Sequence, residues 1–281
     1  MVVELFGGMG NQMFQYALFL KLKHLGVDVK FDISEYDKED KLRKYSLDVF
    51  NINKENDSTI EGETLLFKIA NRLQKNGLIF DEMVGDRVGH YRPEVFQQSK
   101  YTRIRGYWQN EKYFSDVSNL VRCTYSFDEK KINNKNIELG NLMSSVDSVS
   151  VHIRRGDYLD EVNQRIYGGI CDEKYYKKAI SQIKSLVPEA VLYVFSDDLE
   201  WVKENIIRDD MTLIDWNKED DSWQDMYLMS RCKHHIIANS TFSWWGAWLG
   251  DNDDKIVISP NKWFANREST EIICDDWIRI K

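Results

Sequence analysis

Short apolar segments and amphipathic segments alternate along the second half of the chain, and this alternation limits the possible folds more than any other feature. The apolar segments have the length of strands and lie at residues 149–154, 191–195, 211–214, 235–238 and 256–259. Helices are predicted between them, at residues 172–187, 198–207, 222–232 and 241–249. Because strands that are joined through helices run parallel, the pattern predicts an α/β fold with a parallel sheet covered by helices on both faces.

The first 33 residues have the same organisation. An apolar run at residues 2–6 is broken by Gly7-Gly8-Met9-Gly10, a helix is predicted from Asn11 to the glycine at position 26, and a second strand is predicted at residues 27–33. The apolar stripe of this helix consists of Phe14, Leu18, Leu22 and Leu25. This part of the chain therefore predicts the beginning of a βαβ unit.

The middle of the chain gives weaker signals. A helix is predicted at residues 64–76, a strand at 101–107 and a helix at 111–121, while the rest of residues 34–100 is polar and irregular. The polar run at residues 133–141 is the expected linker. We therefore expect an N-terminal domain of residues 1–140 and a C-terminal domain of residues 141–281.

The charge and the cysteines restrict the class of protein. With 38 Lys and Arg against 46 Asp and Glu, the net charge is −8, which disfavours nucleic-acid binding because that needs a basic face. The four cysteines lie far apart, which predicts free thiols in a reducing cytoplasm. The N-terminus has no signal-peptide pattern, and no stretch reaches the roughly 18 apolar residues of a membrane helix. We expect a soluble cytoplasmic protein that works at the inner face of a membrane.

The segment Ser150-Val151-His152-Ile153-Arg154-Arg155-Gly156-Asp157 carries the strongest chemical signal. Alternate residues of a strand share a face, so His152 and Arg154 point the same way and Arg155 the other. A parallel strand is normally apolar, and a buried guanidinium needs a partner. The segment therefore predicts an anion site, and the alternative is an internal ion pair such as Arg155 with Asp157.

Two other segments predict contacts with an anion. Gly7-Gly8-Met9-Gly10-Asn11-Gln12 leads into a helix, whose first backbone N–H groups favour negative charge. Asn239-Ser240-Thr241-Phe242 brings hydroxyl and amide side chains to the start of another helix, which suits a diphosphate. The alternatives are a tight turn in the first segment and ordinary helix capping by Ser240 or Thr241 in the second.

Several acidic residues and a histidine pair have ordinary structural explanations. Asp225 lies early in a predicted helix, where a carboxylate complements the helix dipole. Asp197 and Asp198 suggest a metal-binding acidic pair, but a cap by Asp197 with Glu200 three residues later explains them better. The adjacent histidines at 234 and 235 point to opposite faces of a strand, so no metal site is predicted.

Together these segments resemble the α-1,2-fucosyltransferases of glycosyltransferase family 11. The resemblance also rests on Gly106-Tyr107-Trp108-Gln109, Phe195-Ser196-Asp197-Asp198, Ser243-Trp244-Trp245 and Pro260-Asn261-Lys262-Trp263-Phe264. The segments span nearly the whole chain in the order found in the family. The H-x-R-R-x-D motif at residues 152–157 is shared with α-1,6- and protein O-fucosyltransferases and therefore indicates a user of GDP-fucose in general.

The resemblance implies a GT-B fold, in which two Rossmann-like domains face a central cleft and the C-terminal one binds the donor. It also implies inversion at the fucose anomeric carbon without a metal or another cofactor. Arg154 would contact the β-phosphate, and His152 and Asp225 would recognise guanine. The expected catalytic residues are Arg154, Asn11 and Asp157, and the expected substrate-binding residues are Gly8, Gly10, His152, Arg155, Asp225, Asn239, Ser240, Thr241 and Phe242.

The expected partners are GDP-fucose and an oligosaccharide that ends in galactose, whose 2-hydroxyl is the expected acceptor. A general base is not singled out by the residues, since Asp157, Asp160 and Glu161 all lie near the arginine motif. Two alternatives stay open: a GT-B transferase that uses another nucleotide sugar, and a non-catalytic carbohydrate-binding module whose nine tryptophans stack on sugars.

Overall fold

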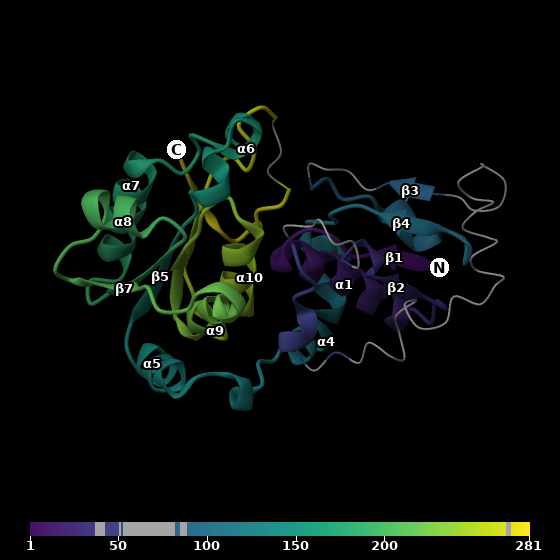
Figure 1. Ribbon diagram of the computed structural model, residues 1–281, viewed down its shortest axis with the longest axis horizontal. Helices are drawn as coiled ribbons and strands as arrows, with labels where there is room; N and C mark the ends of the chain where they lie inside the picture. Colours follow the sequence, from purple (N-terminus) through teal and green to yellow (C-terminus); the bar gives the residue numbers. More distant parts are fainter. Residues whose placement is uncertain (37–42, 51, 53–81, 85–88, 268–270) are drawn as a thin grey trace. The chain divides into compact units, whose positions relative to one another are not determined.

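The computed structural model describes residues 1–36, 43–50, 52, 82–84, 89–267 and 271–281 (Figure 1). It divides into two compact units, Met1–Ser126 and Phe127–Lys281. The predicted helix at residues 64–76 lies outside the described residues.

The described part of the second unit contains a sheet of six parallel strands in the order β10-β9-β8-β5-β6-β7. Their bounds are β5 Ser148–Ile153, β6 Val191–Ser196, β7 Met211–Ile214, β8 His234–Ile236, β9 Val257–Pro260 and β10 Ile278–Ile280. The five predicted strands are confirmed within one or two residues at most ends, and the parallel sheet is confirmed. Strand β10 was not predicted, because residues 256–259 were expected to form the last strand.

Helices cover both faces of this sheet, as predicted (Figure 1). They are α5 Asn134–Ser145, α6 Glu161–Tyr167, α7 Glu173–Leu186, α8 Leu199–Asn205, α9 Trp223–Arg231 and α10 Thr241–Leu249. On one face, Val151 and Val194 pack with Tyr176 of α7. On the other face, Phe195 packs with Met143 of α5 and Leu228 of α9. Alternate residues of β6 thus supply two separate cores.

The linker predicted at residues 133–141 is wrong, because these residues belong to helix α5. Asn133 caps this helix by accepting a hydrogen bond from the Asn136 N–H at 2.8 Å. Asn136, Gly140 and Met143 share its buried face. A helix whose buried face contains an amide and a glycine gives a weak hydrophobic period, so the segment resembles a polar linker. The boundary expected after residue 140 falls inside this helix.

The first unit contains, in its described part, a parallel sheet in the order β2-β1-β4-β3. The strands are β1 Val2–Glu4, β2 Lys30–Asp32, β3 Glu82–Val84 and β4 Arg103–Arg105, and the helices are α1 Met9–His24 and α4 Ser118–Thr124. Helix α1 begins at Met9, two residues before the predicted start. Leu25 lies beyond its end and is 49% exposed, so its place on the buried stripe was predicted wrongly.

The helix predicted at residues 111–121 is only partly present. Residues Glu111–Tyr113 and Ser115–Val117 form two 3-10 turns, and α4 begins at Ser118. The backbone at Phe114 (φ −143°, ψ 9°) leaves the helical region and separates the two turns. The Phe114 side chain is fully buried beside the Phe14 ring of α1, with ring centroids 6.2 Å apart.

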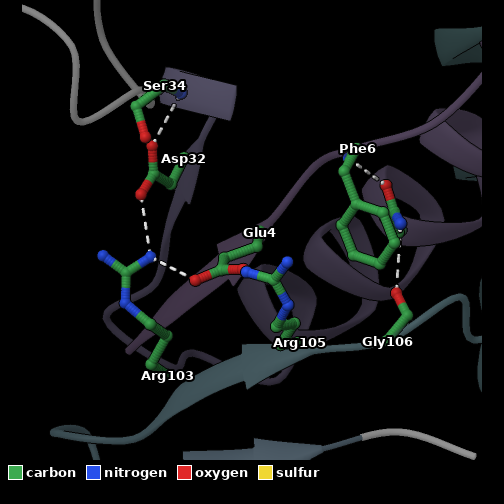
Figure 2. A network of polar contacts seen from close by, with 8 residues as sticks. Glu4, Phe6, Asp32, Ser34, Arg103, Arg105 and Gly106 are labelled. Atoms are coloured by element: carbon green, nitrogen blue, oxygen red, sulfur yellow. Dashed lines mark hydrogen bonds and ion pairs between the residues drawn. The ribbon is translucent and has the colours of Figure 1, made fainter. Parts of the chain in front are cut away.

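Buried polar contacts join the strands of the first unit (Figure 2). Arg103 donates to Glu4 at 2.6 Å and to Asp32 at 2.8 Å, which links β4, β1 and β2. The Gln15 side chain of α1 accepts from the Phe6 N–H at 2.9 Å and donates to the Gly106 carbonyl at 3.1 Å. These contacts fix the loops that follow β1 and β4 against the helix.

Candidate functional site

The strand order of the second unit predicts where a ligand would bind. From β5 the chain continues to β6 and β7 on one side of the sheet, whereas β8, β9 and β10 lie on the other side. Ligands of such sheets bind outside the carboxyl ends of the strands at this reversal, which here lies between β5 and β8. The predicted arginine segment forms the end of β5 and the turn after it, and the segment from Asn239 to Phe242 follows β8. The topology thus brings together two segments that are about 85 residues apart, as the Ser150–His235 pairing shows.

Arg154 is held by two carboxylates at this edge. Its Nη2 lies 2.7 Å from Asp157 Oδ1, and its Nη1 lies 2.8 Å from Asp197 Oδ2. Burial works against the charged guanidinium, but the charges of Asp197 and Asp157 outweigh it and raise the pKa of Arg154. The ion-pair alternative therefore applies to Arg154 itself. A guanidinium has five N–H donors, so two ion pairs leave donors for a further anion.

Arg155 points away from Arg154, as the strand alternation predicts. Its Nε lies 3.0 Å from Asp198 Oδ2, and its guanidinium lies over the Trp201 ring of α8 at 4.1 Å. Asp198 also caps α8, since it accepts from the Trp201 N–H at 3.2 Å. The cap predicted for Asp197 is therefore wrong. The structure places Arg155 against α8, and its expected contact with substrate stays a prediction.

Asp197 also binds the backbone next to Arg154. Its Oδ1 accepts from the Arg155 N–H at 2.8 Å, while its Oδ2 pairs with Arg154. A Cβ added to Gly156 would lie 2.6 Å from Asp197 Oδ2, a separation that real Cβ atoms essentially never show. The lack of a Cβ at Gly156 therefore leaves room for the Asp197 carboxylate beside the turn after β5.

His152 shares the strand face of Arg154 and is 6% exposed. Burial, and then the positive charge of Arg154, lower the pKa of His152 to about 3, so the imidazole is neutral at physiological pH. Its buried Nδ1 has no hydrogen-bond partner within the part of the chain that the structure describes. Phe242 of α10 lies beside the ring, with centroids 5.9 Å apart. A buried ring nitrogen in this position needs a partner, which a bound base can supply.

The segment after β8 contains both structural and unassigned groups. Ser240 caps α10 by accepting from the Phe242 N–H at 3.3 Å, which confirms the capping alternative for this residue. The Asn239 amide donates to the carbonyls of Tyr167 and Trp263 at 3.1 and 3.0 Å. Asn239 therefore joins three segments, and Thr241 begins α10 with a partly exposed side chain. The first N–H groups of this helix remain suited to an anion.

Asp225 lies in the first turn of α9, as predicted. The Asn217 Nδ2 donates to its Oδ1 at 2.8 Å. Burial raises the pKa of Asp225 to about 7, although the hydrogen bond from Asn217 opposes this shift. A helix-start charge alone does not explain a partly buried carboxylate whose pKa is raised, so the site interpretation gains support. Neither Asn217 nor the residues behind it gave any signal in the sequence.

The first unit has a comparable site at the reversal between β1 and β4. The Gln109 Nε2, which follows β4, donates to Asn11 Oδ1 at 2.8 Å. Gly7 has φ +80°, and a Cβ there would lie 2.8 Å from Asn11 Nδ2. Gly8 caps α1 without a side chain, and Gly10 is buried in its first turn. The glycines thus admit Asn11 close to the backbone, and Gln109 fixes the orientation of its amide.

The remaining candidates for metal or disulfide chemistry have structural roles. His235 Nδ1 lies 2.8 Å from Ser150 Oγ, and His234 Nδ1 accepts from the Ile256 N–H at 3.1 Å. Within the described ranges, no three or more His, Cys, Asp or Glu side chains form a group that fits a metal ion. No disulfide joins the four cysteines, all of which lie in the described part of the chain. None of the helices in the described part is long and apolar enough to span a bilayer.

Comparison with known proteins agrees with this geometry. The profile of a family described as glycosyl transferase family 11 matches residues 1–281. An alpha-1,2-colitosyltransferase of Escherichia coli is 36% identical over 297 aligned residues, which cover 100% of this chain and 98% of that protein. The human galactoside alpha-(1,2)-fucosyltransferase 1 is 36% identical over 107 residues, covering 37% of this chain and 29% of that protein.

Among solved structures, the chain is similar to NodZ from Bradyrhizobium, an alpha-1,6-fucosyltransferase soaked with GDP-fucose. The match covers 88% of this chain and 91% of that chain, with a TM-score of 0.52 and 14% identity. At this identity the likeness shows the fold alone, and the expected GT-B class is confirmed.

Proposed function

Since the chain belongs to glycosyl transferase family 11, we propose that it transfers L-fucose from GDP-fucose to the 2-hydroxyl of a terminal galactose in a glycan, with inversion at the fucose anomeric carbon. The fucose donor is supported by the α-1,2-fucosyltransferase among the relatives, and the linkage by both relatives, whose names specify α-1,2 transfer.

One observation carries the proposal. At the carboxyl end of β5, the Arg154 guanidinium and the His152 Nδ1, which has no hydrogen-bond partner among the described residues, occupy the same strand face beside the reversal of the strand order. A nucleoside diphosphate presents a base and two phosphates, which match a neutral ring nitrogen and a guanidinium. Asp225 adds an acceptor for the guanine N1–H and N2–H donors.

The chemistry of transfer assigns a role to each group. The bond from the anomeric carbon to the β-phosphate oxygen breaks while a bond to the acceptor oxygen forms, and negative charge develops on the phosphate. Arg154 stabilises this charge with the N–H donors that its ion pairs leave unused, and the first N–H groups of α10 add to this effect. The acceptor hydroxyl releases its proton to a base or to water.

We assign Asp157 to the orientation of Arg154 rather than to proton transfer. The carboxylate lies 2.7 Å from the guanidinium. Asp157 contacts Nη2 of Arg154 and Asp197 contacts its Nη1, and together the two ion pairs fix the plane of the guanidinium.

A second candidate is the transfer of colitose, because the relative that is 36% identical over the whole chain is named for that sugar. Both candidates use the same nucleotide chemistry and differ in the sugar. Incubation of the protein with a terminal galactoside and either GDP-fucose or a GDP-activated colitose distinguishes them. We expect GDP release and a glycan larger by one fucose with the first donor. If the protein transfers colitose faster than fucose, colitose replaces fucose as the proposed sugar. If no product forms with either donor, the proposal is contradicted.

A further inference from the structure

A chain of hydrogen-bonded side chains ends at Asp225. Trp216 Nε1 donates to Asn136 Oδ1 at 2.8 Å, Asn136 Nδ2 donates to Asn217 Oδ1 at 2.8 Å, and Asn217 Nδ2 donates to Asp225 Oδ1 at 2.8 Å. We call Trp216, Asn136 and Asn217 the amide relay. Asn136 is fully buried in α5, and Asp225 lies in α9, so the relay joins two helices through the loop after β7.

The donor at one end of the amide relay and the acceptor at the other end fix the direction of its hydrogen bonds. An indole N–H can only donate, so Asn136 must turn its oxygen to Trp216 and its NH₂ group to Asn217. Asn217 must then present its own NH₂ group to Asp225. An ionised carboxylate can only accept, so the last hydrogen bond of the relay matches the charged form of Asp225.

A second fixed donor holds the amide relay in this orientation. The backbone N–H of Asn133 donates to Gln224 Oε1 at 3.0 Å, and Asn136 Nδ2 donates to the same oxygen at 2.8 Å. Asn136 thus receives its orientation from Trp216 on one side and from Gln224 on the other. Lys135 lies over the Trp216 ring at 3.2 Å from the centroid, which restricts the indole. Rotation of any one amide would break hydrogen bonds at both ends of that side chain.

We propose that the amide relay is a positioning device for base recognition: it holds the Asp225 carboxylate as an acceptor that faces the guanine N1–H and N2–H donors of the nucleotide. This inference rests on the proposed function, because it takes GDP as the leaving group. It extends that function to residues that do not touch the nucleotide, since Asn136 has no exposed surface. Among the described residues, Asn217 is the one side chain that donates a hydrogen bond to Asp225.

The test removes the last donor of the amide relay and measures base selectivity. Asn217→Leu keeps the side-chain size and removes the hydrogen bonds. Asn205→Leu is the matched control, because Asn205 also donates one side-chain hydrogen bond, to the Trp201 carbonyl at 2.8 Å, outside the site. Binding of GDP, IDP and UDP is measured by calorimetry. GDP and IDP differ only in the 2-amino group of the base, so their ratio reports the contact with Asp225.

We expect wild-type protein and Asn205→Leu to prefer GDP over IDP by the same factor. In Asn217→Leu this preference should fall by about tenfold, the value of one hydrogen bond to a charged group. The KM for GDP-fucose should rise while kcat stays within about twofold, because Asp225 contacts the base equally before and during transfer. Trp216→Phe keeps an aromatic ring and removes the first donor, so the preference should fall by about threefold. This variant serves if Asn217→Leu does not fold.

The outcomes separate the relay from the proposed function. If Asp225→Asn loses the preference for GDP while Asn217→Leu and Trp216→Phe keep it, the relay inference is wrong and the donor assignment stands. If wild-type protein binds GDP and UDP equally and Asp225→Asn changes neither, the proposed donor is wrong and the inference fails with it.

Discussion

Replacing Arg154 by alanine tests the proposed site most directly, because the side chain has both a structural and a chemical role. The substitution removes ion pairs of 2.7 and 2.8 Å to Asp157 and Asp197. The three side chains are 25%, 33% and 26% exposed, so these pairs lie between surface pairs, worth about 0–1 kcal/mol, and buried pairs, whose disruption costs about 3–5 kcal/mol. We expect a loss of about 1–2 kcal/mol in the free energy of unfolding, or roughly 2–8 °C in Tm.

The effect on transfer should be much larger. Arg154 donates to charge that develops only as the sugar departs, and removal of one preorganised donor typically lowers turnover by roughly 10²–10³. Arg154→Lys keeps the positive charge but lacks the planar fork that bridges two carboxylates while donating to a phosphate, so it should lose most of the same factor. The binding of GDP, by contrast, should weaken only moderately in both variants.

Arg103 provides a matched control in the first unit. It is also held by two carboxylates, at 2.6 Å from Glu4 and 2.8 Å from Asp32, and it is more buried than Arg154 (Figure 2). Arg103→Ala should therefore lower Tm at least as much as Arg154→Ala and leave the transfer rate per folded molecule within a few fold of wild type. Tm by calorimetry, and initial rates of GDP release and glycan formation, give both quantities. A folded Arg154→Ala protein that transfers fucose at nearly the wild-type rate would refute the reasoning.

Three further predictions follow from the same residues. Burial raises the pKa of Asp225 to about 7, and the guanine N–H donors need the ionised carboxylate, so the preference for GDP over UDP should grow from pH 6 to pH 8. The diphosphates of the two nucleotides titrate alike, so their own titration cancels in the ratio of the two affinities. A ratio of affinities that is as flat with pH in wild type as in Asp225→Asn would contradict the role of Asp225 in base recognition. Gly156→Ala should lower kcat at least about tenfold, because the new Cβ would meet Asp197 at 2.6 Å and displace the fork of Arg154; unchanged kinetics would show that this close approach is not needed. Transfer should survive EDTA, and activity that is abolished by EDTA and restored by Mn²⁺ would assign a metal to Asp197 and Asp198.

Most strands of the two sheets were predictable because their signals are local. Apolar runs of strand length, glycine turns and helical stripes each occupy fewer than 20 residues and need no knowledge of their partners. The parallel sheet and its carboxyl-end site follow from their alternation. The same procedure failed for α5, since its buried face consists of Asn136, Gly140 and Met143 rather than an apolar stripe. The sequence does not show that Asn136 belongs to a hydrogen-bonded core.

The partners of buried polar groups were not predictable from local patterns. The Asn217 amide is separated from its donor Asn136 by 81 residues and from its acceptor Asp225 by eight. Amides of this kind occur in any polar loop, and only the packing of α5 against α9 makes them a relay. The raised pKa of Asp225 has the same origin, because burial is a property of the fold.

The ion pairs of Arg154 and Arg155 are partly predictable from local patterns, because they depend on the register of two neighbouring strands. Strands β5 and β6 pair in parallel with Ile153 opposite Ser196, so the next residues, Arg154 and Arg155, come opposite Asp197 and Asp198. Because successive residues of a strand point to opposite faces, the Arg154–Asp197 pair lies at the expected ligand edge and the Arg155–Asp198 pair lies against α8, as the structure shows. The two adjacent arginines after β5 therefore come into register with the two adjacent aspartates after β6, and two ion pairs form. The register makes the ion-pair and anion-site interpretations of the arginine segment compatible, because the carboxylates fix the plane of the Arg154 guanidinium and its unused N–H donors remain directed by that plane.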